Sequence, residues 1–227
     1  MKNLFLFIII VFIFIFITNY FIKNKENFNN TIQGYSDENS NWIEPKIFKN
    51  LITKEDADYI IQKSEKLFTT SQIMSGIDTN IRKSETAWID KSDPIIYKII
   101  KKVCDINNLP IDNAEPLQIV RYGPSGYYNE HHDACCDENE ECRNFIKFGG
   151  QRQKTMVIYL TDDFEGGGTI FPKLNKIIKP NRCDGILFNP LETGTSKCHP
   201  KALHAGMPVK SGIKYIANVW IREDKFK

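Results

Sequence analysis

Hydrophobic side chains form one long uninterrupted run at the start of this chain and only short runs afterwards. Within residues 4–22 every side chain is apolar except Thr18 and Asn19, and none is charged. A helix over these residues would be about 28 Å long at about 1.5 Å per residue, which matches the hydrocarbon core of a bilayer. The run ends without the small residues typical of a cleavage site. We therefore predict an uncleaved transmembrane signal-anchor over residues 1–22; a cleaved signal peptide and a buried core helix are the alternatives.

Residues 23–41 are polar and rich in asparagine, and they predict a stalk in front of one folded domain over residues 42–227. The positive charges on the two sides of the anchor are nearly balanced, so they do not fix its orientation. All six cysteines follow the anchor, and an even number behind such a segment is typical of an oxidising lumen. We predict a single-pass membrane protein whose folded domain lies in an ER-type lumen. A cytosolic domain with reduced thiols is the alternative.

Two helices are predicted near the start of the folded domain. The segment TKED at 53–56 has the pattern of a capping box with aspartate in place of glutamate, and the helix should reach about Phe68. The segment SDP at 92–94 places proline at the first position of a second helix. Isoleucines at helical spacing continue this helix to about Asp105.

From Pro116 onward, short β-branched and aromatic runs alternate with turns rich in Gly, Pro and Asn. The predicted strands lie near residues 46–52, 117–122, 127–133, 155–161, 168–171, 175–178, 185–188, 202–206 and 213–222. So many short strands indicate a β-sandwich or a jelly roll. Residues 134–150 show no clear period and are predicted to form an irregular insertion.

Composition and charge exclude several classes of protein. The chain has 30 Lys and Arg against 28 Asp and Glu, a formal net charge of +2. This balance lacks the basic footprint of a nucleic-acid-binding domain, so no nucleic-acid partner is expected. The 13 glycines and 10 prolines exclude collagen-like and low-complexity chains.

A His-x-Asp pair is the first candidate for chemistry. Residues i and i+2 of a strand face the same side, so His131 and Asp133 could hold one metal ion while His132 points away. A third ligand from a distant strand, His204 or His199, would complete a triad of two histidines and one carboxylate. Such a triad suits non-haem Fe(II). Taken alone, the pair is more typical of a surface strand edge, so this hypothesis depends on the residues around it.

A second pattern lies near the C-terminus. The run HAGMPVKSGIKYIANVW at 204–220 places a histidine ten residues before Lys214, with a turn and the start of a strand between them. A lysine on an inner strand could pair with the far carboxylate of a dicarboxylate. An ordinary solvated lysine is the alternative.

Together these patterns resemble the prolyl 4-hydroxylases, within the 2-oxoglutarate- and Fe(II)-dependent dioxygenases. The matching segments lie, in order, at 122–133, 150–160, 166–172 and 204–220. The resemblance covers residues 117–222 densely and 42–116 loosely. It implies an α+β, mainly β fold: a double-stranded β-helix (jelly roll) over about residues 116–222 with flanking N-terminal helices, here preceded by one transmembrane helix.

The resemblance implies His131, Asp133 and His204 as the ligands of an Fe(II) ion, and no catalytic side chain beyond these ligands. His204 is preferred to His199 because the Pro-Val-x-x-Gly-x-Lys pattern follows His204 at the family's spacing.

The same resemblance implies contacts to the cosubstrate and the substrate. Lys214 would pair with the far carboxylate of 2-oxoglutarate, in a pocket that Tyr122 and Trp220 complete. Tyr128 and Arg152 match positions that contact the peptide substrate. Oxygen-sensing and lysyl hydroxylases carry arginine in place of the lysine, so the lysine implies the collagen-type and plant-type prolyl 4-hydroxylases.

The implied activity is that of a membrane-anchored dioxygenase that converts peptidyl proline to 4-hydroxyproline and releases succinate and CO2. The implied cofactors and cosubstrates are Fe(II), 2-oxoglutarate, O2 and L-ascorbate, and the implied partner is a proline-containing peptide or protein. Two alternatives stay open. One is the same chemistry on lysine or another substrate; the other is a catalytically inactive binding module tethered to the membrane.

Three of the cysteines, Cys135, Cys136 and Cys142, lie in the insertion at 134–150. Adjacent cysteines rarely bond to each other, so Cys135 and Cys136 would need separate partners. Disulfides within or from the insertion are favoured. Free thiols are one alternative, and a metal site is another, although the spacing lacks the usual zinc pattern.

Overall fold

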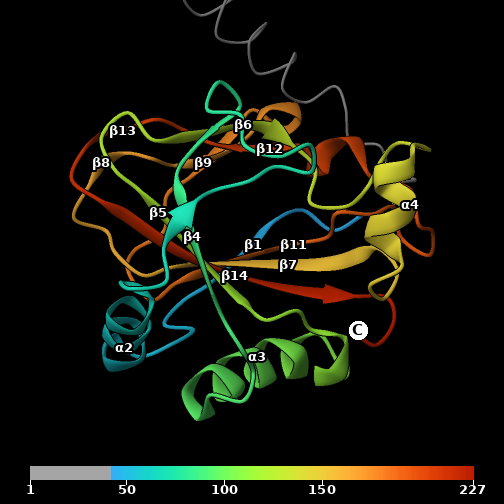
Figure 1. The fold of residues 1–227 in the computed structure, drawn as a ribbon, viewed down its shortest axis with the longest axis horizontal. Helices are drawn as coiled ribbons and strands as arrows, with labels where there is room; N and C mark the ends of the chain where they lie inside the picture. The colour runs from blue at the N-terminus through green and yellow to red at the C-terminus, as the bar shows by residue number, and fades with distance from the viewer. Residues whose placement is uncertain (1–41) are drawn as a thin grey trace, which may run out of the picture. The chain divides into compact units, whose positions relative to one another are not determined.

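The computed structural model describes residues 42–227, which form mainly antiparallel β-structure with three α-helices (Figure 1). The seven-stranded sheet has the order β1 (Lys46–Phe48), β11 (Gly185–Phe188), β7 (Arg152–Tyr159), β14 (Lys214–Arg222), β5 (Leu117–Tyr122), β4 (Glu85–Ile89), β2 (Thr69–Thr70). The five-stranded sheet has the order β10 (Lys176–Ile178), β9 (Thr169–Phe171), β12 (His204–Gly206), β6 (Tyr127–His131), β3 (Arg82–Lys83). A separate pair joins β13 (Val209–Ser211) to β8 (Glu165–Gly166). The mainly β class is thus confirmed, and the two layers are consistent with a jelly roll.

Two hydrophobic cores lie on the two faces of the seven-stranded sheet, because successive side chains of a strand point to opposite sides. On β14, Ala217 and Val219 pack in the core under the helices. Ile216 packs in the other core, between the two sheets. Lys214 and Trp220 share the strand face of Ile216, so both point toward the five-stranded sheet.

Helices α2 (Lys54–Ser64) and α3 (Pro94–Ile106) cover the outer face of the seven-stranded sheet (Figure 1). The predicted capping box at Thr53 is present, and Asp93 caps α3 by accepting two backbone N–H bonds. Helix α2 ends at Ser64, before the predicted end near Phe68. The chain turns there toward β2, which pairs with β4.

Further elements differ from the sequence-based prediction, among them the short strands β2, β3, β8 and β13, which were not predicted. The insertion at 134–150 is not wholly irregular, because it contains α4 (Glu140–Ile146), capped by the side chain of Asn139. A helix of seven residues is too short to show a clear apolar period. Strand β4 was also not predicted. It forms by pairing with β5, and this partner is distant in sequence, so the local pattern does not reveal the pairing. Short 3-10 helices also occur: η1 (Ile111–Asn113), η2 (Pro172–Leu174) and η3 (Pro200–Ala202).

No helix within residues 42–227 is long and apolar enough to cross a membrane. The predicted anchor at 1–22 and the predicted stalk at 23–41 lie outside the described residues.

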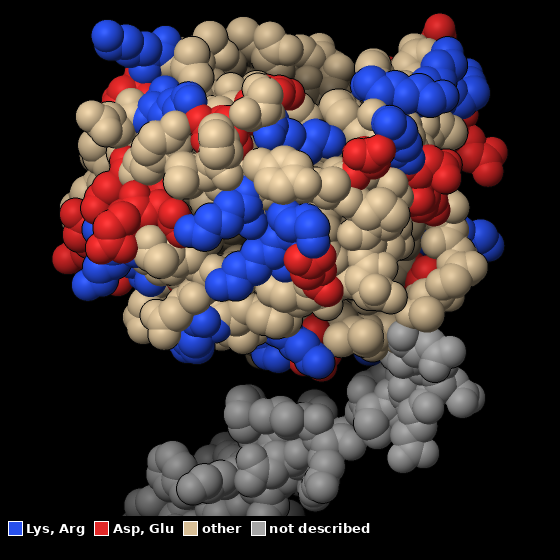
Figure 2. Space-filling view, turned by 90° about the horizontal axis from the view of Figure 1, so that it is seen from below, with Lys and Arg blue, Asp and Glu red and all other residues tan. Residues whose placement is uncertain are grey.

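The face seen in Figure 2 carries charges of both signs close together. On α3, Lys98 pairs with Asp56 and Lys101 pairs with Asp105. The Lys101–Asp105 pair is exposed on both sides, and such pairs contribute little to stability. A surface on which positive and negative charges alternate creates no strong electrostatic potential of one sign.

Candidate active site

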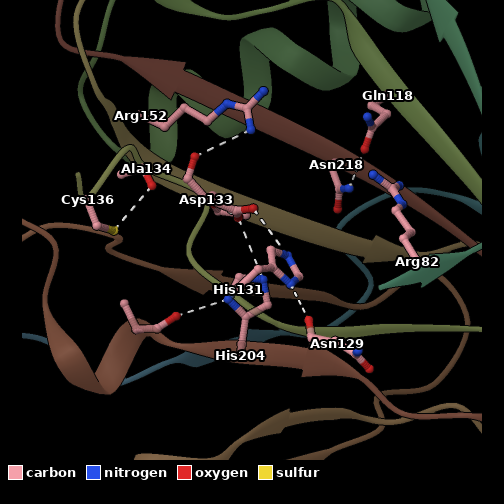
Figure 3. A network of polar contacts seen from close by, with 12 residues as sticks. Arg82, Gln118, Asn129, His131, Asp133, Ala134, Cys136, Arg152, His204 and Asn218 are labelled. Atoms are coloured by element: carbon pink, nitrogen blue, oxygen red, sulfur yellow. Dashed lines mark hydrogen bonds and ion pairs between the residues drawn. The ribbon is translucent and has the colours of Figure 1, made fainter. Parts of the chain in front are cut away.

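The five-stranded sheet brings the three predicted metal ligands together. His131 on β6 lies directly opposite His204 on β12 in the antiparallel register. Asp133 follows β6, and its carboxylate oxygens lie 3.7 Å from His131 Nε2 and 3.8 Å from His204 Nε2 (Figure 3). One donor atom of each residue lies within 4.8 Å of the other two. His199, the competing candidate, is not in this cluster and instead stacks on Trp42.

Backbone carbonyls orient both imidazole rings. His131 Nδ1 lies 2.8 Å from the carbonyl oxygen of Asn129, and His204 Nδ1 lies 3.0 Å from that of Ala202. A carbonyl oxygen only accepts, so in each neutral ring Nδ1 carries the proton and Nε2 presents its lone pair. Tyr128 stacks on the His131 ring with 3.6 Å between the ring centres. Both rings are therefore held in the tautomer and orientation that a metal ligand needs.

The Asp133 carboxylate is buried, and one of its oxygens accepts a 2.8 Å hydrogen bond from the Thr155 hydroxyl. Burial raises the pKa of this carboxyl, but electrostatic interactions with His204, His131 and Arg152, and the hydrogen bond from Thr155, outweigh burial and lower the pKa to about 2. Burial, with a further contribution from His204, lowers the pKa of His131 to about 3. An ionised carboxylate beside a neutral imidazole is the protonation state that binds a divalent metal.

Replacing Thr155 with valine removes the hydroxyl that orients Asp133 and keeps the side-chain shape. We expect Fe(II) affinity to fall by about 10- to 100-fold, as is usual for partners that orient metal ligands. Titration of the metal-free chain measures this change, and Thr70→Val, on the exposed edge strand β2, is the matched control. Equal affinities in the two variants would contradict the role assigned to Thr155.

Lys214 begins β14, and only 1% of its surface is exposed. Its Nζ lies 5.2 Å from the ring centre of Tyr122 and 5.0 Å from that of Tyr159. Burial, with a smaller contribution from the charge of Lys179, lowers the pKa of Lys214 to about 7, and no opposite charge in residues 42–227 offsets this shift. A buried cation without a counter-ion is costly, and a carboxylate ligand would relieve that cost. The position therefore fits the far end of a dicarboxylate.

Binding of 2-oxoglutarate should take up a proton above pH 7. About nine-tenths of Lys214 is neutral at pH 8 in the free protein if its pKa is about 7, whereas pairing with a carboxylate requires the ammonium form. Burial raises the pKa of Tyr122 and of Tyr159, so neither phenol supplies this proton change. The affinity should weaken by up to about tenfold per pH unit above 7.

Calorimetry in two buffers of different ionisation enthalpy, with Mn²⁺ in place of Fe(II), measures this proton uptake. The Lys214→Arg variant is the control, because arginine stays protonated in proteins. A wild-type binding enthalpy that is the same in both buffers at pH 8 would show that Lys214 is already charged in the free protein.

A cavity of about 290 Å³ lies between the histidine cluster and Lys214. Its lining includes Tyr122, Trp220, Tyr128 and Arg152, so all the predicted contact residues reach one space. The Arg152 guanidinium pairs with Glu115 through two nitrogen–oxygen contacts of 2.6 and 2.8 Å. It also lies 3.4 Å from the ring centre of Trp220. Arg152 is therefore part of the cavity wall, and it shares the buried carboxylate of Glu115 with Arg222.

Sequence reasoning missed several polar residues around this cavity. Asn218 donates a 2.9 Å hydrogen bond to Gln118, and both side chains are buried in the cavity wall. Arg82 is also buried, 4.6 Å from the ring centre of Tyr128. The sequence did carry a signal for these residues. Gln118 and Asn218 are polar residues within strands whose other residues are mostly apolar. They alternate along each strand with the residues that face the helices, so they point toward the cavity.

Two disulfides connect the insertion. Cys135 bonds to Cys142 within it, and Cys136 bonds to Cys198 in the segment before η3. The prediction that the adjacent cysteines take separate partners is confirmed. The other two cysteines are free and buried.

Comparison with known proteins identifies the class to which this fold and site belong. Residues 117–222 match the model of the 2OG-Fe(II) oxygenase superfamily. A protein of Acanthamoeba polyphaga mimivirus, named "Putative prolyl 4-hydroxylase", is 47% identical over 192 residues, covering 85% of this chain and 79% of that protein. Prolyl 4-hydroxylase 1 of Arabidopsis thaliana is 30% identical over 198 residues, covering 78% of this chain and 68% of that protein.

A solved structure supports the same class. The viral collagen prolyl hydroxylase of Paramecium Bursaria Chlorella virus-1, determined as a 2OG complex, is 32% identical. Its TM-score is 0.63, and the match covers 80% of this chain and 96% of that chain. The protein is therefore an oxidoreductase of the 2OG-Fe(II) oxygenase superfamily, whose members use Fe(II), 2-oxoglutarate and O2. Within that superfamily the chain belongs to the prolyl 4-hydroxylase family, as the sequence resemblance implied.

Proposed function

We propose that this protein hydroxylates peptidyl proline at C4 and converts 2-oxoglutarate to succinate and CO2. One observation carries the proposal: the cluster of His131, Asp133 and His204 shares one cavity with the buried amine of Lys214, which has no counter-ion within residues 42–227. The first group suits a metal, and the second suits a dicarboxylate. The names of the viral and plant relatives support proline as the substrate side chain.

The donor set of the cluster fits Fe(II). Two imidazole nitrogens and one carboxylate oxygen suit this ion and leave other coordination positions open for ligands. When bound, the iron supplies the oxidation chemistry that couples decarboxylation of 2-oxoglutarate to hydroxylation of the substrate. The protein's part is to hold these ligands: two backbone carbonyls fix His131 and His204, and the Thr155 hydroxyl fixes Asp133.

Other residues of the chain position the two organic reactants. Lys214 would hold the far carboxylate of 2-oxoglutarate, between walls formed by Tyr122 and Trp220. At the outer rim of the cavity, Trp88 is 46% exposed, and its ring centre lies 6.0 Å from that of Trp220. An aromatic rim of this kind suits an extended, proline-rich peptide, which loses little conformational entropy on binding. Tyr128, stacked on His131, would lie between the peptide and the iron site.

We also propose L-ascorbate as the reductant that restores iron after turnovers uncoupled from substrate. We propose a single-pass anchor over residues 1–22 and a folded domain on the lumenal side. The apolar run at 4–22 supports the anchor. The two disulfides support an oxidising compartment.

The full-length chain in detergent, supplied with Fe(II), 2-oxoglutarate, ascorbate and O2, tests the activity on proline-rich and collagen-like peptides. We expect a mass gain of one oxygen atom per modified peptide, located at C4 by amino-acid analysis. Peptides with alanine in place of proline are the control. No hydroxyproline on any proline-containing peptide, together with succinate formation that lysyl peptides stimulate and proline peptides do not, would contradict proline as the substrate. Peptide binding without succinate would favour an inactive binding module.

A further inference from the structure

A second group of metal-type donors lies next to the proposed iron site. His132, Cys136 and Cys198 each offer one donor atom, and the three atoms lie within 4.8 Å of one another. His132 stands between two proposed iron ligands in sequence, but it clusters with the two sulfur atoms and not with His131, Asp133 and His204. The group is therefore distinct from the proposed iron ligands.

The imidazole of His132 lacks a partner at one nitrogen. Its Nδ1 is buried and makes no hydrogen bond within the described part of the chain. A buried polar atom without a partner is costly and rare in folded proteins. The two sulfur atoms nearby are joined as the Cys136–Cys198 disulfide, and Cys136 is exposed, so a reductant can reach this bond.

We propose that reduction of the Cys136–Cys198 disulfide creates a zinc site. A dithiol reductant donates two electrons and two protons to the disulfide, which becomes two thiols while the reductant becomes a disulfide. Zn²⁺ then displaces both thiol protons and binds two thiolate sulfurs and one nitrogen of His132. Water completes the tetrahedral coordination that zinc prefers.

This site connects the two segments that carry the proposed iron ligands. Cys136 lies three residues after Asp133, and Cys198 lies six residues before His204. In an oxidising compartment the disulfide cross-links these segments; in a reducing one, zinc takes over the same cross-link. The cross-link thereby keeps the distance between the proposed iron ligands on the two segments, Asp133 and His204, in both compartments. The inference concerns metal binding and is independent of the substrate proposed above.

The test uses the full-length Cys135→Ser/Cys142→Ser variant, in which Cys136–Cys198 is the only remaining disulfide. The protein is treated with a dithiol, freed of reductant and titrated anaerobically with Co²⁺, a spectroscopic substitute for Zn²⁺. Thiolate coordination to Co²⁺ produces an intense near-ultraviolet charge-transfer band. The proposed iron ligands contain no sulfur and produce no such band.

We expect the band after reduction and its absence before reduction. Added Zn²⁺ should displace the Co²⁺ and remove the band. In the same background, Cys198→Ser should abolish the band, and His132→Ala should weaken Co²⁺ binding by about tenfold or more. No band despite two newly titratable thiols, or a band that persists in Cys198→Ser, would overturn the proposal.

Thermal melting covers the case in which reduction alone unfolds the protein. A ligand that binds only the folded state raises the melting temperature. One equivalent of Zn²⁺ should therefore restore a cooperative transition in the reduced protein and fail to do so in its Cys198→Ser counterpart. Equal responses of the two proteins to Zn²⁺ would also overturn the proposal.

Discussion

Substitution of His204 by alanine should remove both iron binding and hydroxylation, whereas His199→Ala should leave both intact. His204 faces His131 across the β6–β12 pair and provides one of only two imidazoles in the cluster. Loss of a partner that merely orients a ligand costs about 10- to 100-fold in metal affinity, so loss of a ligand should cost at least that much. Turnover should fall below detection, because iron is the site of the chemistry.

His199 is a matched control because it is the histidine that sequence spacing left in competition. It stacks on Trp42 with 4.4 Å between ring centres and caps η3, outside the proposed iron cluster. The measurement is the iron content of each purified variant together with its rate of succinate formation. Melting temperatures of both variants separate loss of metal from loss of fold. Iron retained at full stoichiometry in His204→Ala would exclude the proposed triad.

Replacement of Lys214 by methionine should weaken 2-oxoglutarate binding by about 10- to 150-fold. This range corresponds to the loss of a charge-assisted hydrogen bond worth about 1.5–3 kcal/mol. The Michaelis constant for 2-oxoglutarate should rise, while metal binding should be unchanged because Lys214 does not belong to the histidine cluster. Lys210→Met, an exposed lysine on β13, is the control. An unchanged Michaelis constant in Lys214→Met would show that the cosubstrate binds elsewhere.

The same substitution should stabilise the ligand-free protein. The pKa of Lys214 is about 7 in the fold, below the usual value near 10.4 expected of the unfolded chain. Protonation of Lys214 is therefore less favourable in the folded protein than in the unfolded chain. The resulting loss of stability is largest at and below pH 7 and vanishes above about pH 10. Melting temperatures measured across this range should show the greatest gain for Lys214→Met at pH 7 or lower. Loss of function with a gain of stability is the pattern expected of a binding residue.

The sequence alone determined features that depend on near neighbours. The i, i+2 spacing of His131 and Asp133 predicted a shared face, because a strand alternates its side chains locally. The caps at Thr53 and Asp93 were also visible, since a cap involves only residues a few positions apart. The ordered motifs from Tyr122 onward indicated the family. The resemblance to that family then implied a mainly β fold and a set of residues that contact the cosubstrate and the substrate.

The tertiary structure decided features that depend on contacts between distant segments. Only the pairing of β12 with β6 places His204, and not His199, opposite His131, and this pairing joins segments more than seventy residues apart. The partner of Cys136 was open for the same reason, because many pairings satisfy the same spacing. Within residues 42–227, the lack of a counter-ion for Lys214 and of a hydrogen-bond partner for His132 Nδ1 could be found only from the complete surroundings of each group. Burial and hydrogen bonding are sums over all neighbours in space, and sequence proximity identifies only a few of these neighbours.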